Sequence, residues 1–166
     1  MSSDGKVLHA RHDGVHVLRY VGDIRYILSP SIERFLDEIF SGPGPAGFVI
    51  DLTETDSIDS TNLGLLARIA MRMQVLGAPR VTLVSNRADI NSVLTSMALD
   101  EVFDIVDDSG VVTGKAQELP QADADRETLA RTLIDAHRAL MELSEHNREM
   151  FRDVLASLEK NRAGSR

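Results

Sequence analysis

The chain has 166 residues, 43% of them hydrophobic and 27% charged, a balance typical of one soluble globular domain with a small appendage. Its formal net charge of −8 repels nucleic-acid phosphates and anionic lipid, so we expect protein partners and neither nucleic acid nor a membrane. The absence of cysteine excludes disulfides, thiolate catalysis and cysteine-based metal sites. No run approaches the roughly 18 apolar residues that span a bilayer, and the N-terminus has no apolar signal core. We therefore expect a cytoplasmic protein.

The first two thirds of the chain alternate short strands with helices. Two alternating runs, 7–12 and 15–21, flank Asp13-Gly14 and predict a β-hairpin. Apolar patterns and their stop signals predict further elements, with strands over 48–52, 81–84 and 102–106 and helices over 31–40, 62–76 and 89–97. This order, ββαβαβαβ, predicts an α/β fold with a mixed, largely parallel sheet, an opening hairpin and covering helices.

The C-terminal part has a different pattern. Residues 108–121 are rich in Asp, Ser, Gly, Gln and Pro, and predict a linker after a first domain over 1–107. One long amphipathic helix is then expected over 122–162, because apolar residues recur at alternating spacings of four and three. The stripe consists of Leu129, Leu133, Ala136, Leu140, Leu143, Asn147, Met150 and Val154. Asn147 falls at an a position, where Asn can set the register of a parallel dimer, but the stripe fits packing on its own domain or on a partner helix equally well.

The most informative stretch leads from the strand over 48–52 into the helix expected from Asn62. It contains Asp59-Ser60-Thr61, which places hydroxyls at a helix N-terminus, where free backbone N–H groups and the helix dipole can hold a phosphate. By itself this cluster is ordinary capping chemistry, since Asp, Ser and Thr are preferred N-caps. Asn62 is an alternative cap, and it would leave Ser60 one step further out.

Over about residues 6–107 the chain resembles the STAS-domain anti-sigma-factor antagonists. The resemblance rests on the element order and on two blocks, 50–66 (IDLTETDSIDSTNLGLL) and 93–105 (VLTSMALDEVFDI). In that family the residue after the motif aspartate accepts a phosphate, which implies Ser60 as the phosphoacceptor here. The resemblance also implies an anti-sigma factor or a serine kinase of the histidine-kinase-like ATPase type as a partner, and a PP2C-type phosphatase that restores the serine.

Two positions depart from the family pattern. Asn62 stands where the family usually has Gly, and Arg25 ends the run Gly22-Asp-Ile-Arg25 where many members have an acidic residue. These departures put the tightness of the turn and the kinase contacts in question. The same run and the helical extension look more like the HsbA-type subgroup of antagonists.

The resulting hypothesis is a switch without enzyme activity, in which unphosphorylated Ser60 allows docking on a regulator and phosphorylation releases it. Thr61 and Ser57 are rival acceptors, but we expect Ser57 at a buried strand exit. The expected docking residues are Asp23, Arg25, Asp59, Thr61, Asn62, Gly64, Leu65 and Arg68, and those expected inside are Leu63, Leu66, Ala70 and Met73. The alternative is a structural scaffold that acts through the C-terminal helix, with Ser60 only a helix cap.

Other groupings of reactive side chains point to no chemistry. His9, His12 and His16 suggest a metal site, but strand alternation puts His9 and His12 on opposite faces and no carboxylate pair completes a site. The sequence has no nucleophile elbow, Walker A motif or glycine-rich phosphate loop, so we expect neither catalysis nor a cofactor. His137 and His146 are expected to be surface or seam residues of the C-terminal helix.

Overall fold

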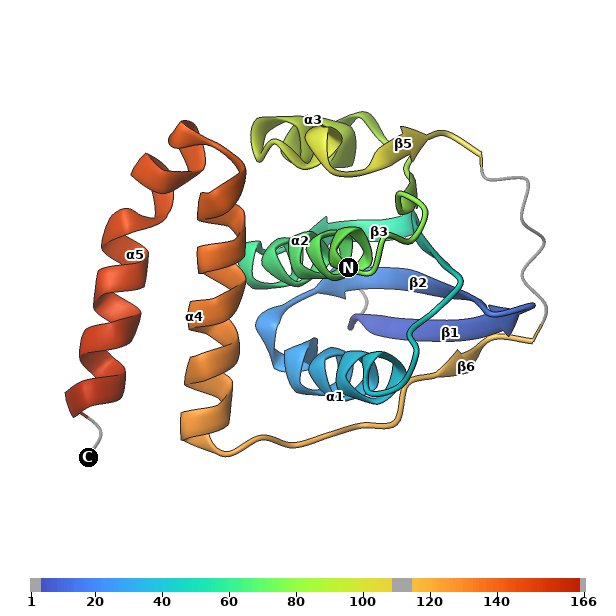
Figure 1. Cartoon of the computed structure of the whole chain (residues 1–166). Helices are drawn as coiled ribbons and strands as arrows, with labels where there is room; N and C mark the ends of the chain where they lie inside the picture. The colour runs from blue at the N-terminus through green and yellow to red at the C-terminus, as the bar shows by residue number, and fades with distance from the viewer. Residues whose placement is uncertain (1–3, 109–114, 165–166) are drawn as a thin grey trace.

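A mixed six-stranded sheet forms the frame of the protein in the computed structural model, which describes residues 4–108 and 115–164 (Figure 1). Its strand order is β5-β4-β3-β2-β1-β6. The strands are β1 (Lys6–His12), β2 (Val15–Ile24), β3 (Gly47–Ile58), β4 (Thr82–Val84), β5 (Asp104–Val106) and β6 (Gln117–Glu118). Strands β2 to β5 pair in parallel, whereas β1 is antiparallel to both β2 and β6. The predicted α/β fold with a largely parallel sheet is confirmed.

The opening hairpin follows the sequence signal closely. Asp13 and Gly14 have φ values of 50° and 80°, and His12 pairs with Val15 on the other side of the turn. A two-residue turn with positive φ at both positions matches the twist of the flanking strands. Gly adopts such a φ without steric strain and Asp tolerates it, which is why this dipeptide fixes the register.

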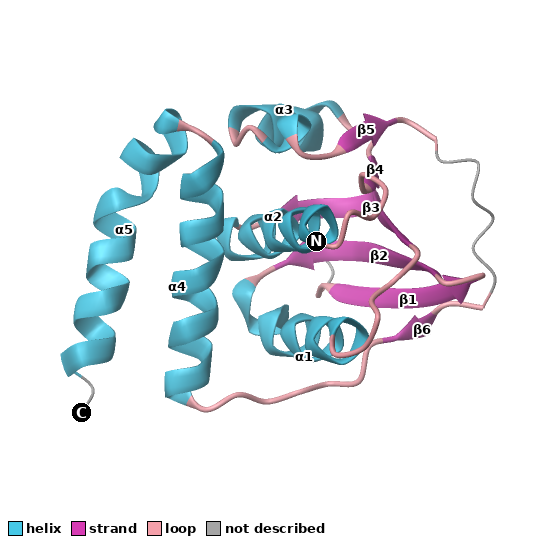
Figure 2. Cartoon of the chain, viewed as in Figure 1, coloured by secondary structure: helices cyan, strands magenta, loops and turns pink. Residues whose placement is uncertain are grey.

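Helices cover the sheet and one of its ends. Figure 2 shows α1 (Ser29–Phe40) and α2 (Ser60–Val75) over the same face of the sheet, with α3 (Ala88–Ser96) beside β5. Two 3-10 turns, η1 (Tyr26–Leu28) and η2 (Leu99–Glu101), precede α1 and follow α3. The residues of α2 expected inside are all buried: Leu63, Leu66, Ala70 and Met73. They pack into one core with apolar side chains of α1 and the central strands.

The segment predicted to be a linker contributes to the sheet. Within residues 108–121, β6 pairs with β1 through Leu8 and His9, and Leu119 N donates to the Val7 carbonyl at 3.0 Å. Leu119 is buried against the core. The linker prediction is therefore wrong for this part of the segment, whereas residues 109–114 lie outside the described residues. The polar composition hid a short edge strand, which a single buried side chain anchors.

The C-terminal region forms two helices in place of the one predicted over 122–162. They are α4 (Arg126–Leu143) and α5 (Glu145–Gly164). Ser144 separates them with φ −160° and ψ 157°, and its hydroxyl accepts the Asn147 backbone N–H at 3.0 Å. Ser144 thus caps α5, and the two helices pack side by side as an antiparallel pair (Figure 1).

This break also overturns the heptad seam. Ala136, Leu140 and Asn147 are buried within the chain, whereas Met150 and Val154 are each 41% exposed. Asn147 Nδ2 donates to the carbonyls of Leu140 and Met97, both at 2.8 Å, so this side chain is used inside the chain and not at a dimer register. Self-association through α5 stays a prediction that the structure does not test.

Two histidines of the hairpin lie together beneath α1. A ring nitrogen of His9 lies 2.8 Å from one of His16, and the two rings stack 5.1 Å apart next to Phe35. Burial lowers the pKa of His16 to about 4, with the charges of His9 and Arg11 adding to the effect. Among the described residues, no cluster of three or more His, Asp or Glu side chains has a geometry that would hold a metal ion. Within those residues no helix has the length and apolar character needed to cross a bilayer.

Candidate functional site

Asp59 is the N-cap of α2. It has extended backbone angles, φ −84° and ψ 170°, and its Oδ1 accepts from the Asn62 backbone N–H at 3.0 Å and from Asn62 Nδ2 at 2.9 Å. The helix therefore begins at Ser60, earlier than predicted, and the alternative cap Asn62 is wrong. Asn62 is 0% exposed and lies inside the first turn. Ser60 becomes the first helical residue, where backbone N–H groups have no helical acceptor and the helix dipole favours an anion.

The end of β2 holds this cap in place. Asp59 N donates to the Ile24 carbonyl at 3.0 Å, and Ile24 pairs with Ile58 in the parallel register of β2 and β3. The carboxyl ends of the two strands therefore meet at one edge of the sheet. This edge brings Asp23 and Arg25 to the same end of the molecule as Ser60, as the sequence predicts for a parallel sheet.

Ser60 contacts a residue of the C-terminal region. Its Oγ lies 2.9 Å from His137 Nε2, and His137 Nδ1 lies 2.7 Å from the Leu133 carbonyl. A carbonyl oxygen only accepts, so Nδ1 carries the proton of the neutral ring and Nε2 accepts from the Ser60 hydroxyl. His137 is 4% exposed and packs edge-on against Phe151 of α5 at 5.3 Å. The Ser60 hydroxyl thus has a partner within its own chain.

Helix α4 covers the N-terminal half of α2. Their backbones approach at Gly64, where an added Cβ would lie well inside 3.0 Å of the Ala136 carbonyl oxygen. Only glycine fits such an approach. Thr61, Gly64 and Leu65, which we expected nearer the exposed docking surface, are buried in this arrangement, and so is the expected docking residue Asn62.

Arg68, one turn further along α2, pairs with Glu33 of α1 and is partly buried. Burial raises the pKa of Glu33, and the Arg68 guanidinium opposes this rise. Both partners come from helices on the same face of the sheet. Arg68, one of the expected docking residues, therefore has an ion-pair partner within its own chain.

The α4–α5 hairpin lies beyond the carboxyl ends of β2 and β3, across the edge where α2 begins (Figure 1). At one end Asn147 of α5 holds the Met97 carbonyl after α3. Sequence reasoning missed His137 as a partner of Ser60 and expected it at the surface or in a seam. The only signal was its place beside Ala136 and one turn from Leu140 on the apolar stripe.

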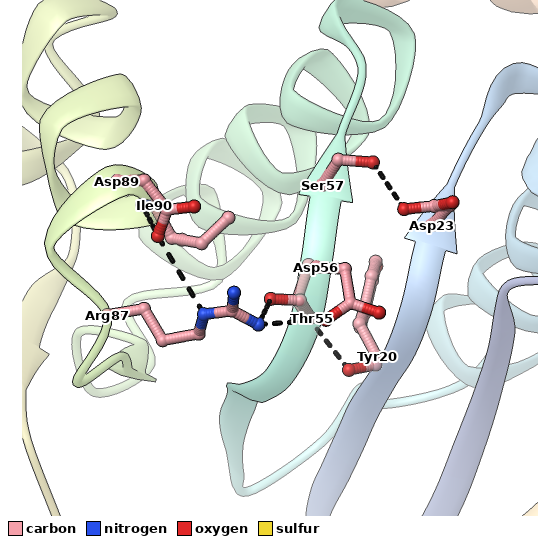
Figure 3. A network of polar contacts seen from close by, with 8 residues as sticks. All are labelled: Tyr20, Asp23, Thr55, Asp56, Ser57, Arg87, Asp89 and Ile90. Carbon is pink, nitrogen blue, oxygen red and sulfur yellow. Dashed lines mark hydrogen bonds and ion pairs between the residues drawn. The ribbon is translucent and has the colours of Figure 1, made fainter. Parts of the chain in front are cut away.

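The neighbouring part of this edge remains open. Figure 3 shows Ser57 of β3 directed toward Asp23 of β2, and Ser57 Oγ donates to Asp23 Oδ1 at 2.9 Å. Ser57 is exposed, so the expected burial of Ser57 is wrong. Arg25, Tyr26 and Ile27 follow β2, and the two apolar side chains are 50% and 76% exposed. Exposed large apolar residues beside charged ones are typical of protein contact surfaces.

Arg87 is a second residue that sequence reasoning missed. From the loop before α3, its Nη1 donates to the Thr55 carbonyl and to Asp56 Oδ1, both at 2.9 Å (Figure 3). The hydrogen bond with Asp56 raises the pKa of the guanidinium. Thr55 is held in turn by its own hydroxyl, which donates to the Tyr20 carbonyl at 2.8 Å. These hydrogen bonds hold the C-terminal end of β3 in place, just before the site.

The contact between Ser60 and His137 has two of the three parts of a hydrolytic triad. Ser60 and His137 are placed like a nucleophile and its base, but the third partner is the Leu133 carbonyl and not a carboxylate that could stabilise an imidazolium. A phosphorylated Ser60 has no proton to donate at Oγ. The hydrogen bond that the Ser60 hydroxyl donates to His137 Nε2 is therefore lost on phosphorylation.

A family model described as the STAS domain matches residues 7–111. The chain is also similar to a solved crystal structure of an anti-sigma factor antagonist from Mycobacterium paratuberculosis. The two are 22% identical with a TM-score of 0.53, and the match covers 63% of this chain and 89% of that one. No curated protein matches the chain. The matched range includes Ser60 and α2, whereas α4 and α5 lie outside it.

Proposed function

The chain belongs to the STAS-domain family, and we propose that it is an anti-sigma-factor antagonist controlled by phosphorylation of Ser60. In this proposal the unphosphorylated chain binds an anti-sigma factor or a related regulator, and phosphorylation releases it. The kinase is a serine kinase of the histidine-kinase-like ATPase type, and a PP2C-type phosphatase restores the serine. The observation that carries the proposal is the position of Ser60 as the first residue of α2, directly after the capping Asp59.

The switch follows from charge at the helix terminus. A phosphate adds about −1.5 to −2 charge at pH 7. The N-terminus of α2 attracts that charge, whereas Asp59, the N-cap next to it, repels it. The fold should survive, because Ser60 is only partly buried. A partner that has to bury the dianion would lose affinity unless it supplied compensating cations.

The docking surface in this proposal has an open and a covered part. Arg25, Tyr26 and Ile27 are accessible in the resting chain, next to the partly exposed Asp23. Gly64 lies beneath α4, and Thr61 and Leu65 are buried in the same half of α2, so a docking role for these residues requires the packing around α2 to change. Phosphorylation at the rivals Thr61 and Ser57 is less favourable, since Thr61 is 5% exposed and the Ser57 hydroxyl is outside the helix terminus.

One observation favours a second candidate, a scaffold that recruits partners through its C-terminal region. Met150 and Val154 lie one turn apart on α5, and both are exposed. In that case Ser60 is only a helix residue that holds His137. A variant with both exposed α5 residues changed to Glu separates the two functions, because the switch keeps Ser60-dependent binding whereas the scaffold loses its partner binding.

Intact-mass and phosphopeptide analysis tests the proposal on protein isolated from its own cells, with and without prior phosphatase treatment. We expect one removable phosphate localised to Ser60. A Ser60→Ala chain expressed in the same cells is the matched control and should stay unmodified. An unmodified Ser60 across growth conditions, or a phosphate that persists in the Ala variant, would contradict the proposal.

A further inference from the structure

We propose that the N-terminal half of α2 is a binding face for one α-helix at a time, and that α4 and a helix of the regulator compete for it. The face is defined by Ser60 and Gly64, which contact His137 and Ala136 of α4. In the resting chain α4 occupies it. The regulator, whose existence rests on the function proposed above, replaces α4 with a helix of its own.

The residue at position 64 defines what the face accepts. The Ala136 backbone lies so close to Gly64 that a side chain at position 64 would prevent the approach. Gly within a helix is less favourable than Ala by about 1 kcal/mol, so Gly64 lowers the intrinsic helix stability of α2 at this position. Because Gly64 has no side chain, the surface of α2 has a shallow groove at this position. A second helix can pack its backbone into this groove if its own residue at the crossing is small. The partner helix therefore presents Gly, Ala or Ser opposite Gly64.

Ser60 supplies the polar half of the same face. Its hydroxyl donates to His137 Nε2, one residue after Ala136 on α4. A replacing helix needs a hydrogen-bond acceptor at that position, because a buried hydroxyl without a partner is costly. A phosphate on Ser60 removes the donor and adds charge, so it weakens both occupants of the face.

The contacts of α4 combine apolar burial with a few hydrogen bonds. Ala136, Ala139 and Leu140 lie in the same buried core as the apolar residues of α2. The hydrogen bond from Ser60, the close crossing at Gly64 and the bond from Asn147 of α5 to the Met97 carbonyl add to this burial. The helices α4 and α5 also pack on each other, with His137 against Phe151. In the proposed exchange the pair leaves the face as a unit and keeps the contacts between its two helices.

The first test uses hydrogen–deuterium exchange on the full chain, without any partner, to measure how firmly α4 and α5 are held on α2. Gly64→Ala adds a methyl group at the crossing, and Gly42→Ala is the matched control because nothing lies within 4 Å of an added Cβ there. We expect amides of α4 and α5 to exchange about tenfold faster in Gly64→Ala only, with β2 and β3 unchanged. Unchanged exchange in α4, or an equal rise in α4 and the sheet, would overturn the assigned crossing.

The second test measures affinity for the purified histidine-kinase-like ATPase that phosphorylates Ser60. His137→Ala loosens α4 and leaves the α2 face intact, so binding should strengthen by about fivefold, as expected when a competing closed state loses one hydrogen bond. The exposed His146→Ala is the matched control and should bind like the unmodified chain. Equal affinity of His137→Ala and His146→Ala would overturn the competition.

Gly64→Ala distinguishes how the regulator binds. Gly64→Ala loosens α4 from α2, but its added methyl group also obstructs an incoming helix. The affinity of Gly64→Ala for the regulator should therefore not rise as that of His137→Ala does. A rise equal to that of His137→Ala would overturn the helix-in-face mode. Failure of the proposed function is distinguishable, because it would appear as equal regulator binding by Ser60→Ala and Ser60→Asp chains, with the exchange result for α4 unaffected.

Discussion

Replacing the cap of α2 is the sharpest test of how the site is built. Asp59→Ala removes the acceptor of two hydrogen bonds, from the backbone N–H and from the side-chain amide of Asn62. Loss of a side-chain cap costs about 1 kcal/mol. Asn62 is 0% exposed and its Oδ1 has no hydrogen-bond partner among the described residues, so the amide group would lose its remaining contact. An orphaned buried donor costs about 1–3 kcal/mol, which gives about 2–4 kcal/mol in total.

Urea unfolding followed by circular dichroism measures this loss in the free energy of unfolding. Asp59→Asn is the matched control, since it keeps the acceptor oxygen and loses only the charge at the helix N-terminus, about 0.3–1 kcal/mol. In the double variant Asp59→Ala with Asn62→Ala the amide is absent, so about 1 kcal/mol or more of the loss should be recovered. The reasoning is refuted if Asp59→Ala is as stable as the wild type, or if the two substitutions add without coupling.

Three further predictions concern other parts of the molecule. The folded-state pKa of His16, about 4, lies below the unfolded value of about 6.5, so its stabilising contribution is present above pH 6.5 and is lost as the pH falls toward 4. Between pH 7.5 and 5 the free energy of unfolding should therefore fall by about 1–2 kcal/mol more in the wild type than in His16→Leu, and equal losses would contradict this. Asn147→Ala should lower stability by about 2 kcal/mol at every protein concentration in urea unfolding, because its two carbonyl partners are intrachain; a concentration-dependent loss would indicate a subunit seam. Ile27→Asp should change stability by less than about 0.5 kcal/mol in the same assay but weaken regulator binding about tenfold in a titration, and unchanged binding would remove Ile27 from the docking surface.

Local signals in the sequence were sufficient to predict most of the strands and helices of the STAS domain. Asp13-Gly14 determines a turn within its own two residues, and the apolar runs over 48–52 and 81–84 mark the buried parts of β3 and β4. The strand β3 continues beyond its apolar run, through polar residues, to Ile58. The sequence also indicated that a helix begins within residues 59–62, because Asp, Ser, Thr and Asn are all preferred caps. The predicted fold and the site edge needed no knowledge of distant contacts.

Boundaries within a run of capping residues were harder. Asp59, Ser60 and Asn62 are all good caps, and the choice depended on the backbone angles that the hydrogen bond to Ile24 imposes on Asp59. Ser144 offered the same chemistry in the C-terminal region. There an apolar spacing that continued past the serine suggested one helix, although Ser144 begins a second one.

The apolar stripe of the C-terminal region allowed packing on its own domain, but no sequence signal placed that packing over Ser60. His137 and Ser60 are 77 positions apart, and nothing in either local pattern links them. Gly64 was read as part of an exposed surface, whereas its lack of a side chain serves the contact with Ala136. Exposure of a helix face depends on which other element packs against it, and periodicity does not identify that element.

The most direct measurement compares regulator binding by two forms of the same purified chain, one phosphorylated at Ser60 by the kinase and one treated afterwards with a PP2C-type phosphatase. The account predicts that phosphorylation weakens binding by about a hundredfold or more, roughly 3 kcal/mol, and that the phosphatase restores it. A Ser60→Ala chain taken through the same steps should bind unchanged throughout. Equal affinity of the phosphorylated and dephosphorylated forms would contradict the central claim that Ser60 controls partner binding.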